Sequence, residues 1–221
     1  MKEKSSSSSS LNVVFGEMTD ERDGQVYKTI TIDGKATWMA ENLNYAYLQP
    51  TSTLDSSSWC YENEPDSCTK YGRLYIWSAV MDSAGVFSDD TKGCGCYADE
   101  EKWYECPVSS NVRGICPEHW HIPTAEEFLV PLSLSNDKSL LYGRDPNRLI
   151  LRNEGKYHGM GFDIRLIGRY ASFWFSTEYD NIDAHCAEFP LVSLSSDMDP
   201  RTVAKKNEAY SLRCVKDEVE K

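Results

Sequence analysis

The segment GICPEHWHIPTAEEF at residues 114–128 holds the side chains best suited to chemistry, a thiol and two imidazoles. Thiolates and imidazoles are the usual ligands of zinc, and imidazole is the commonest general base. However, His119 and His121 are only two residues apart, and no acidic residue stands at the offset that a helical zinc-hydrolase motif requires. Cys116 and these two histidines therefore do not match a known metal pattern.

The same segment has the signature of a helix start. Thr124 and Glu127 stand three residues apart, directly before apolar side chains, which is the spacing of a capping box. Pro131 should end this helix early. The segment is therefore predicted to be a structural element first, with Trp120 in the core and His121 hydrogen-bonded near the helix cap.

Cysteine content points to disulfides. The chain contains eight cysteines: Cys60, Cys68, Cys94, Cys96, Cys106, Cys116, Cys186 and Cys214. An even count in a loop-rich, aromatic-rich chain predicts disulfides and an oxidising compartment. Cys60 and Cys68 suit a local disulfide across a turn. Cys96 and Cys106 are a second suggested pair, which leaves Cys94 to reach elsewhere, with Cys186 as one choice.

Zinc and redox chemistry are the alternatives for the central cysteines. Four thiolates could surround zinc, although the sequence has no C-x2-C knuckle: Cys94, Cys96, Cys106 and Cys116. The run from Cys94 to Cys96 could also be a redox pair, although nothing around it is electropositive enough to lower the pKa of a thiol.

A catalytic centre is hard to assemble from the remaining residues. Cys186 follows His185, but neighbouring residues on a strand point to opposite faces, so His185 is badly placed to activate this thiol. Acidic residues are plentiful, yet a glycosidase needs two carboxylates held at a fixed separation across a cleft, and the acidic clusters here fall in loops. We therefore expect a protein without a catalytic site.

Loop aromatics and loop acids are the candidates for binding. Four aromatic residues lie in polar, loop-like surroundings where a flat ring could stack on a sugar: Trp59, Trp103, Tyr104 and Tyr179. Calcium takes oxygen ligands from acidic loops, which makes one candidate calcium site of Glu178, Asp180 and Asp183. No other cofactor is expected.

Charge and hydropathy narrow the class of partners. The formal net charge is −12 and the basic residues are scattered, which argues against nucleic acid and against an anionic membrane surface. No run approaches the roughly 18 apolar residues that a membrane span needs. Residues 1–22 contain a serine run without an apolar core, so they are expected to be a disordered linker or tag, any signal peptide having been removed or lying outside this sequence.

β-structure is predicted at both ends of the domain. Residues 26–45, VYKTITIDGKATWMAENLNY, predict a hairpin with Asp33-Gly34 as its two-residue turn. Alternating apolar residues predict further strands in the last third of the chain. The fold class is therefore α+β, with two helices and a twisted antiparallel sheet.

The middle of the chain is predicted to be loop-rich. Leu74, Trp77 and Met81 recur at helical spacing, which predicts a helix over residues 71–84. The polar residues before this helix read as a loop. Residues 85–113 show no periodicity and read as a cysteine-rich insertion.

Five motifs occur in order along the chain: VYKTITIDGKATWMAENLNY, CYENEPDSCTKYGRLYIWSAVM, GICPEHWHIPTAEEF, FWFSTEY and YSLRCVKD. Together they resemble the Fibrobacter succinogenes major paralogous domain, over about residues 25–217. That domain looks related to the C-type lectin-like fold, and its WH-x-P-T-x-x-E-F segment is similar to the helix start of the formylglycine-generating, sulfatase-modifying group.

The resemblance implies a single disulfide-stapled domain over residues 23–217, followed by a tail at 218–221, with both ends of the domain on one sheet. It also implies export or surface attachment. Cys60 and Cys68 match the local pair of the family, and Cys116 and Cys214 fall on its other two common positions. The tryptophans inside the motifs are expected in the core: Trp38, Trp77, Trp120 and Trp174.

Three departures weaken any borrowed site. His119 stands where the family usually has glycine, the glycine-rich insertion is shortened to LIGRYASF, and the 85–113 loop is an addition. The leading expectation is a non-catalytic secreted or cell-surface module that binds plant polysaccharide or a partner protein. The alternatives are an enzyme of the sulfatase-modifying type, which needs reduced cysteines, and a structural surface domain without a ligand.

Overall fold

The computed structural model describes residues 12–50, 57–95, 106, 111–128, 157–158, 161–162, 170–190 and 201–218. Within this part the architecture is α+β, with short helices and antiparallel sheets, as predicted. None of the described helices is long and apolar enough to cross a membrane.

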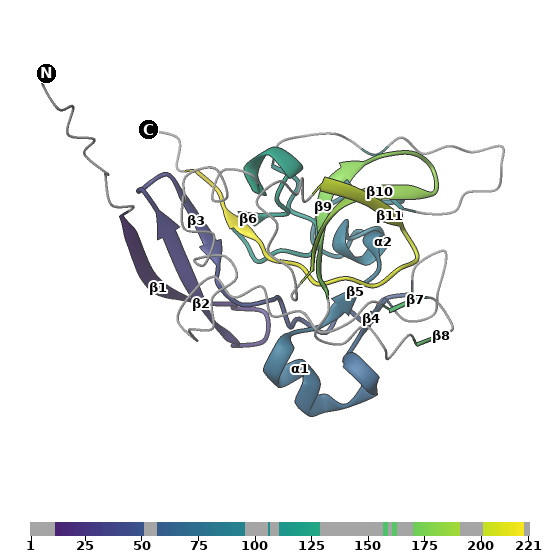
Figure 1. Ribbon diagram of the computed structural model, residues 1–221, viewed down its shortest axis with the longest axis horizontal. Helices are drawn as coiled ribbons and strands as arrows, with labels where there is room; N and C mark the ends of the chain where they lie inside the picture. Colours follow the sequence, from purple (N-terminus) through teal and green to yellow (C-terminus); the bar gives the residue numbers. More distant parts are fainter. Residues whose placement is uncertain are drawn as a thin grey trace, which may run out of the picture.

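The larger sheet joins the two ends of the described chain (Figure 1). It consists, in spatial order, of β1 (Val13–Thr19), β2 (Val26–Ile32), β3 (Ala36–Met39), β12 (Val215–Lys216) and β6 (Trp120–His121). All neighbouring strands are antiparallel. The last strand therefore lies between strands from much earlier in the chain, and both ends of the domain share one sheet, as the resemblance implied.

The predicted hairpin is β2–β3. Asp33 and Gly34 both adopt positive φ angles, 52° and 65°, and the Lys35 N–H donates to the Ile32 carbonyl oxygen at 3.0 Å. Positive φ at two central residues is the geometry that favours Asp-Gly in a tight hairpin turn. The predicted position of the turn is confirmed, but Ile32 pairs with Ala36, so the loop holds three residues, 33–35, and not two.

Strand β1 corrects the expected extent of the linker. The sequence predicts a disordered segment over residues 1–22, but residues 13–19 pair along their whole length with β2. The sequence carries no signal for this strand. Five of its seven residues are exposed, so apolar and polar residues do not alternate along it. Residues 1–11 lie outside the described part.

The helix predicted over residues 71–84 is wrong in its limits. Leu74–Tyr75 form strand β5, paired with β4 (Ser58–Trp59), and after Tyr71, which ends the preceding helix, only α2 (Trp77–Val80) is helical. Leu74, Trp77 and Met81 are all buried, in a stretch enclosed on every side, so their spacing reflects burial and not one helical face. Helical residues lie instead in the expected loop before it.

Those helical residues form η1 (Tyr61–Asn63) and α1 (Pro65–Tyr71). Pro65 occupies the first turn of α1, where its missing N–H costs nothing and its fixed φ suits a helix. Gly72, at φ 77°, ends the helix. The sequence does not predict α1, because its residues are mostly polar and form no apolar face with helical spacing.

The predicted strands of the last third form a second sheet. Its order is β11 (Arg201–Lys205), β10 (Asp183–Pro190) and β9 (Tyr170–Glu178). A separate two-stranded pair is formed by β7 (Tyr157–His158) and β8 (Gly161–Phe162). Two isolated bridges, from Tyr75 to Tyr210 and from Phe173 to Ser211, connect the 210–211 segment with β5 and β9.

Two apolar clusters support these sheets. The larger is built around Tyr47, Tyr75, Trp77, Trp174 and Tyr210. The smaller packs the other face of the hairpin, with Ile30, Trp38, Phe128, Phe173 and Phe175. The four tryptophans expected in the core are all buried: Trp38, Trp77, Trp120 and Trp174.

Three disulfides connect described cysteines. Cys60–Cys68 is confirmed, and Cys116 is bonded to Cys214 across 98 residues. Cys94 is bonded to Cys106. The suggested pairs Cys96–Cys106 and Cys94–Cys186 are therefore wrong. The zinc site of Cys94, Cys96, Cys106 and Cys116 is wrong too, because three of its four sulfurs are in disulfides and are not thiolate ligands. Cys96 lies outside the described residues.

Candidate functional site

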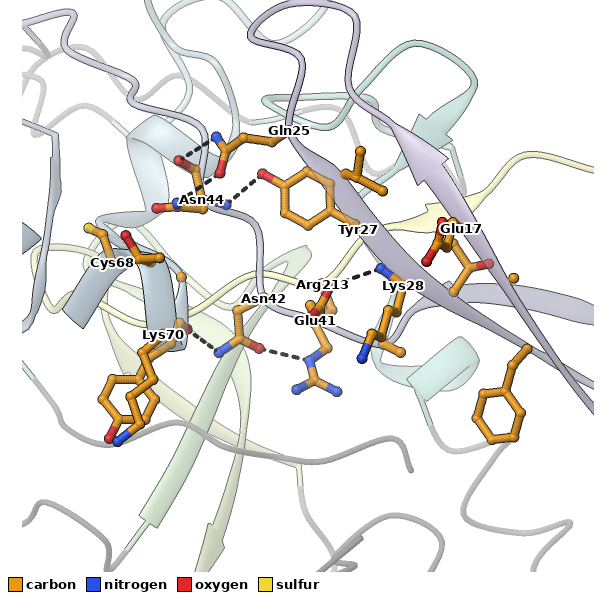
Figure 2. Close-up of a pocket in the computed structure, with 18 residues that line it drawn as sticks. Glu17, Gln25, Tyr27, Lys28, Glu41, Asn42, Asn44, Cys68, Lys70 and Arg213 are labelled. Carbon is orange, nitrogen blue, oxygen red and sulfur yellow. Dashed lines mark hydrogen bonds between the residues drawn. The ribbon is translucent and has the colours of Figure 1, made fainter. Parts of the chain in front are cut away.

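A pocket of about 860 Å³ opens beside the hairpin (Figure 2). Four segments line it: Phe15–Glu17 of β1, the 25–29 stretch that enters β2, the 40–44 segment, and Cys68–Gly72 at the end of α1. Arg213, from the C-terminal segment, completes the lining. The pocket thus gathers residues from both ends of the domain.

The 40–44 segment forms one wall because the strands on either side hold its backbone. The Ala40 N–H donates to the Lys28 carbonyl oxygen at 2.8 Å, and the Leu43 N–H donates to that of Leu212 at 2.8 Å. The Glu41 carboxylate accepts the Lys28 N–H at 2.8 Å. This wall is therefore fixed between β2 and the C-terminal segment.

Asn42 is the buried link between three segments. Its Nδ2 donates to the Tyr71 carbonyl oxygen at 2.8 Å, and its Oδ1 accepts a hydrogen bond from Arg213 Nε at 2.7 Å. Burial lowers the pKa of Arg213 from 12.5 to about 9, opposed by the nearby Glu41 carboxylate. Arg213 therefore keeps its positive charge at neutral pH, and a cation lies at the floor of the pocket.

Helix α1 forms the opposite wall and is held very close to the 42–43 backbone. A Cβ on Gly72 would stand 2.7 Å from Asn42 Cβ and 2.8 Å from the Asn42 carbonyl oxygen, so only glycine fits there. The Arg73 N–H donates to the Leu43 carbonyl oxygen at 3.0 Å. The Cys60–Cys68 disulfide ties the helix to the preceding turn.

A small amide network closes one end of the pocket. The Asn44 N–H donates to the Tyr27 hydroxyl at 3.0 Å, and Asn44 Nδ2 donates to Gln25 Oε1 at 2.8 Å. Burial raises the pKa of Tyr27, so its hydroxyl stays protonated. Figure 2 shows these side chains pointing toward one another across the end of the cavity.

The rim offers apolar rings beside charged groups. Phe15 is 54% exposed, and the Tyr71 ring lies 4.5 Å from Lys70 Nζ. Glu17 and Lys28 are exposed on the neighbouring strands. The pocket therefore combines rings with donors and acceptors of both signs.

The aromatic residues singled out from the sequence lie elsewhere. Tyr179 is 60% exposed in the turn between β9 and β10, where its ring meets His185 edge-on at 5.5 Å. Trp59, in β4, is half-buried against the larger core cluster. Neither lines the pocket. Trp103 and Tyr104 lie outside the described residues.

The three acids proposed for calcium have protein partners at two of the three positions. Glu178 forms an ion pair with Lys206 and accepts the Cys106 N–H at 3.3 Å. Asp180 Oδ1 accepts the backbone N–H groups of Ile182 and Asp183, both at 2.7 Å. The described residues contain no group of three or more side chains placed to hold a metal ion. Calcium binding stays a prediction.

The capping box and its histidine are as predicted. The Glu127 N–H donates to Thr124 Oγ1 at 3.1 Å, and the Thr124 N–H donates to Glu127 Oε2 at 2.8 Å. His121 lies between two carboxylates, with Nε2 at 2.9 Å from Glu127 Oε1 and Nδ1 at 2.7 Å from Asp217 Oδ1. Both nitrogens face acids, so the imidazole is placed to carry a second proton.

Burial lowers the pKa of His121, but its hydrogen bonds to Glu127 and Asp217 outweigh burial and raise that pKa above 6.5. Burial raises the pKa of Glu127, but the hydrogen bonds from His121 and Thr124 outweigh it and bring the pKa below 4.5. This His121 latch (His121, Glu127 and Asp217) joins β6, the helix start and the C-terminal segment. His119 is exposed and does not take part.

The sequence does not predict the pocket, because separate segments of the chain contribute its residues. The one local signal is the polar run Glu41-Asn42 and Asn44, which directly follows a buried strand and interrupts the apolar pattern. The sequence gives no indication that Arg213 lines a pocket, since a lone arginine in a predicted strand is expected at the surface.

Comparison with known proteins gives one match. The family model of the Fibrobacter succinogenes major domain matches residues 31–138. This confirms the resemblance, over a shorter range than the motifs suggested. No curated protein and no solved structure matches the chain. The matched range includes two walls of the pocket, the 40–44 segment and the end of α1.

Proposed function

The chain carries a Fibrobacter succinogenes major domain over residues 31–138, and from this premise we propose that it is a non-catalytic binding module whose pocket takes a saccharide unit of a plant polysaccharide. The observation that carries the proposal is the composition of the pocket beside the hairpin. It holds two rings at its rim, three amide side chains and charges of both signs.

This composition suits a polyhydroxylated ligand. Amide groups both donate and accept hydrogen bonds, as hydroxyl groups do. Asn42 is engaged with Tyr71 and Arg213, so Gln25 and Asn44 are the amides in position to contact such a ligand. An apolar ring covers the C–H face of a sugar, while carboxylates accept hydrogen bonds from its hydroxyl groups and cationic side chains donate to them. Phe15 and Tyr71 are the rings in position to make such a contact.

We infer further that the domain belongs to an exported or cell-surface protein. Three disulfides join described cysteines, and disulfides persist in oxidising compartments. A C-type lectin-like architecture is part of the same proposal. The sharing of one sheet by the first and last strands supports it.

The oxidase alternative requires a pair of reduced cysteines. Six described cysteines are bonded to one another in three disulfides and so supply no reduced thiol, and Cys186 is fully buried in β10. No observation therefore favours the enzyme reading over the binding module.

Affinity electrophoresis in gels containing soluble xylan, polygalacturonate or carboxymethylcellulose tests the proposal. We expect at least one polysaccharide to retard the protein. Tyr71→Ala should lose at least about two thirds of the retardation, because stacking on a ring contributes roughly 1–3 kcal/mol in comparable flat-ring contacts.

Tyr179→Ala is the matched control, since it removes the same side chain from the far turn between β9 and β10. Its retardation should equal that of the unaltered protein. Loss in Tyr179→Ala with no change in Tyr71→Ala would move the site to that turn. An absence of retardation in every gel, together with no retention on insoluble cellulose, would refute saccharide binding.

A further inference from the structure

Among the described strands, β1 pairs with β2 alone and lies at the edge of the larger sheet (Figure 1). Five of its seven residues are exposed, among them Val14 and Phe15, each 54% exposed. Proteins usually protect such an edge with lysine, proline or a bulge. β1 has none of these, and Glu17 is its only charged residue.

The hydrogen-bonding direction of each β1 residue follows from the two ends of the strand. The Asp33 N–H donates to the Asn12 carbonyl oxygen, and the Asp20 N–H donates to that of Gln25, both at 2.8 Å. Antiparallel residues alternate between bonding the neighbour and pointing away from it. The even-numbered residues of β1 therefore face β2, and the odd-numbered ones point their N–H and C=O groups to the open edge.

The odd-numbered residues of β1 are Val13, Phe15, Glu17 and Thr19. If two β1 strands meet antiparallel about a two-fold axis at Gly16, residue 13 falls opposite 19 and residue 15 opposite 17. Every outward-pointing group then meets an outward-pointing group of the second copy. The same register places Gly16 against Gly16 at a non-bonded position, where Cα atoms approach to about 4.5 Å.

The side chains are compatible with that register. Glu17 falls opposite Phe15 of the second copy and not opposite another carboxylate. Within its own sheet Glu17 is paired with Lys28, so its charge has a counter-charge beside it. On the other face Val14 falls opposite Met18. Like charges are nowhere directly opposed, which is the condition for strand pairs to be favourable.

From these observations we propose that β1 is a self-association edge, at which two copies of this chain join their sheets through antiparallel β1–β1 pairing centred on Gly16. The contact is one strand wide and smaller than the roughly 800 Å² per partner of a standard interface. The dimer is therefore weak and concentration-dependent in solution.

A proline substitution at one position of β1 tests the pairing. Glu17→Pro removes an N–H that points to the open edge and leaves the β1–β2 hydrogen bonds in place. Sedimentation velocity from micromolar to millimolar protein should show a monomer–dimer equilibrium, weakened at least about tenfold by Glu17→Pro. Glu17→Ala, which keeps the N–H, should dimerise within about twofold of the unaltered protein. A monomer at every concentration overturns the proposal.

Cysteine cross-linking tests the register and does not depend on how Glu17→Pro folds. Gly16→Cys places a thiol on the two-fold axis, at a Cα separation that a disulfide spans. Mild oxidation should give a covalent dimer on a non-reducing gel. Val14→Cys, equally exposed but opposite Met18 of the second copy, should stay monomeric. Equal cross-linking of both variants, or of neither, overturns the Gly16-centred pairing.

Discussion

Two ionic clusters join distant segments of this protein, and they differ in their access to water. Lys206 and Glu178 form a pair in which both side chains are nearly enclosed, with exposures of 4% and 9%. In the His121 latch the imidazole is equally buried, but Glu127 and Asp217 are 34% and 39% exposed. The first cluster is closed to solvent, and the second keeps two carboxylates partly hydrated.

The closed pair has further partners that fix its geometry. Lys206 Nζ also donates to the Asp180 carbonyl oxygen and lies 5.0 Å from the centre of the Trp77 ring. The Trp77 N–H donates to the Lys206 carbonyl oxygen at 3.1 Å. The pair therefore ties the turn between β9 and β10 to the start of α2. Removing either member of this pair alone leaves the other charge buried without a partner. The His121 latch, in contrast, can lose its ionic contacts stepwise as single groups gain or lose a proton.

The largest effect is expected from breaking the closed pair. Lys206→Met leaves the Glu178 carboxylate buried without its counter-charge, which should lower the free energy of unfolding by about 3–5 kcal/mol. Urea unfolding followed by tryptophan fluorescence measures this. The double variant Lys206→Met/Glu178→Leu should recover most of the loss. A cost below about 1 kcal/mol in the single variant would show that water reaches the pair.

A smaller effect is expected in the latch. His121→Asn removes at least one hydrogen bond to a carboxylate, which should cost about 1.5–3 kcal/mol at pH 6. The partial hydration of Glu127 and Asp217 places the value toward the lower end of that range. If His121→Asn cost as much as Lys206→Met, the contrast between the two clusters would fail.

The latch should also depend on pH on both sides of an optimum. The raised pKa of His121 gives stability that is complete below its ordinary value of 6.5 and is lost as pH rises through the folded-state pKa. The lowered pKa of Glu127 gives stability present above 4.5 and lost as pH falls through its folded-state pKa. The stability difference between the unaltered protein and His121→Asn should therefore be greatest between these two values. A flat difference from pH 4 to 8 would exclude a charged latch.

The smallest effect is expected at the helix cap beside the latch. Thr124→Ala removes the side chain that accepts the Glu127 N–H, which should cost about 1 kcal/mol. Thr124→Ser keeps the hydroxyl and should be nearly neutral. A thermal unfolding series of the two variants measures the cap apart from the latch.

Local sequence signals predicted the local parts of this fold. Asp33-Gly34 marked the hairpin turn, and Thr124 with Glu127 marked the helix start, because each feature is determined within four residues. Tertiary contacts decided the rest. Leu74 is extended because it pairs across to Trp59, and no spacing within residues 71–84 could show that partner.

The candidate site was out of reach for the same reason. Asn42 and Arg213 meet across 171 positions of the chain, and neither type of residue signals a pocket alone. Nothing in the sequence distinguishes Lys206 from the other scattered basic residues, although it is buried against Glu178. Exposed aromatics could be listed from composition, but their grouping around one cavity could not.

The position of β12 sets an order on how this domain can be assembled. Val215–Lys216 fill the gap between β3 and β6, and Cys214 closes a loop of 98 residues onto Cys116. A chain emerging from a ribosome or a secretion channel, amino end first, can form the β2–β3 hairpin at once. It cannot close the larger sheet until residue 216 has emerged, so the hairpin must wait for the last strand of this sheet before the domain is complete.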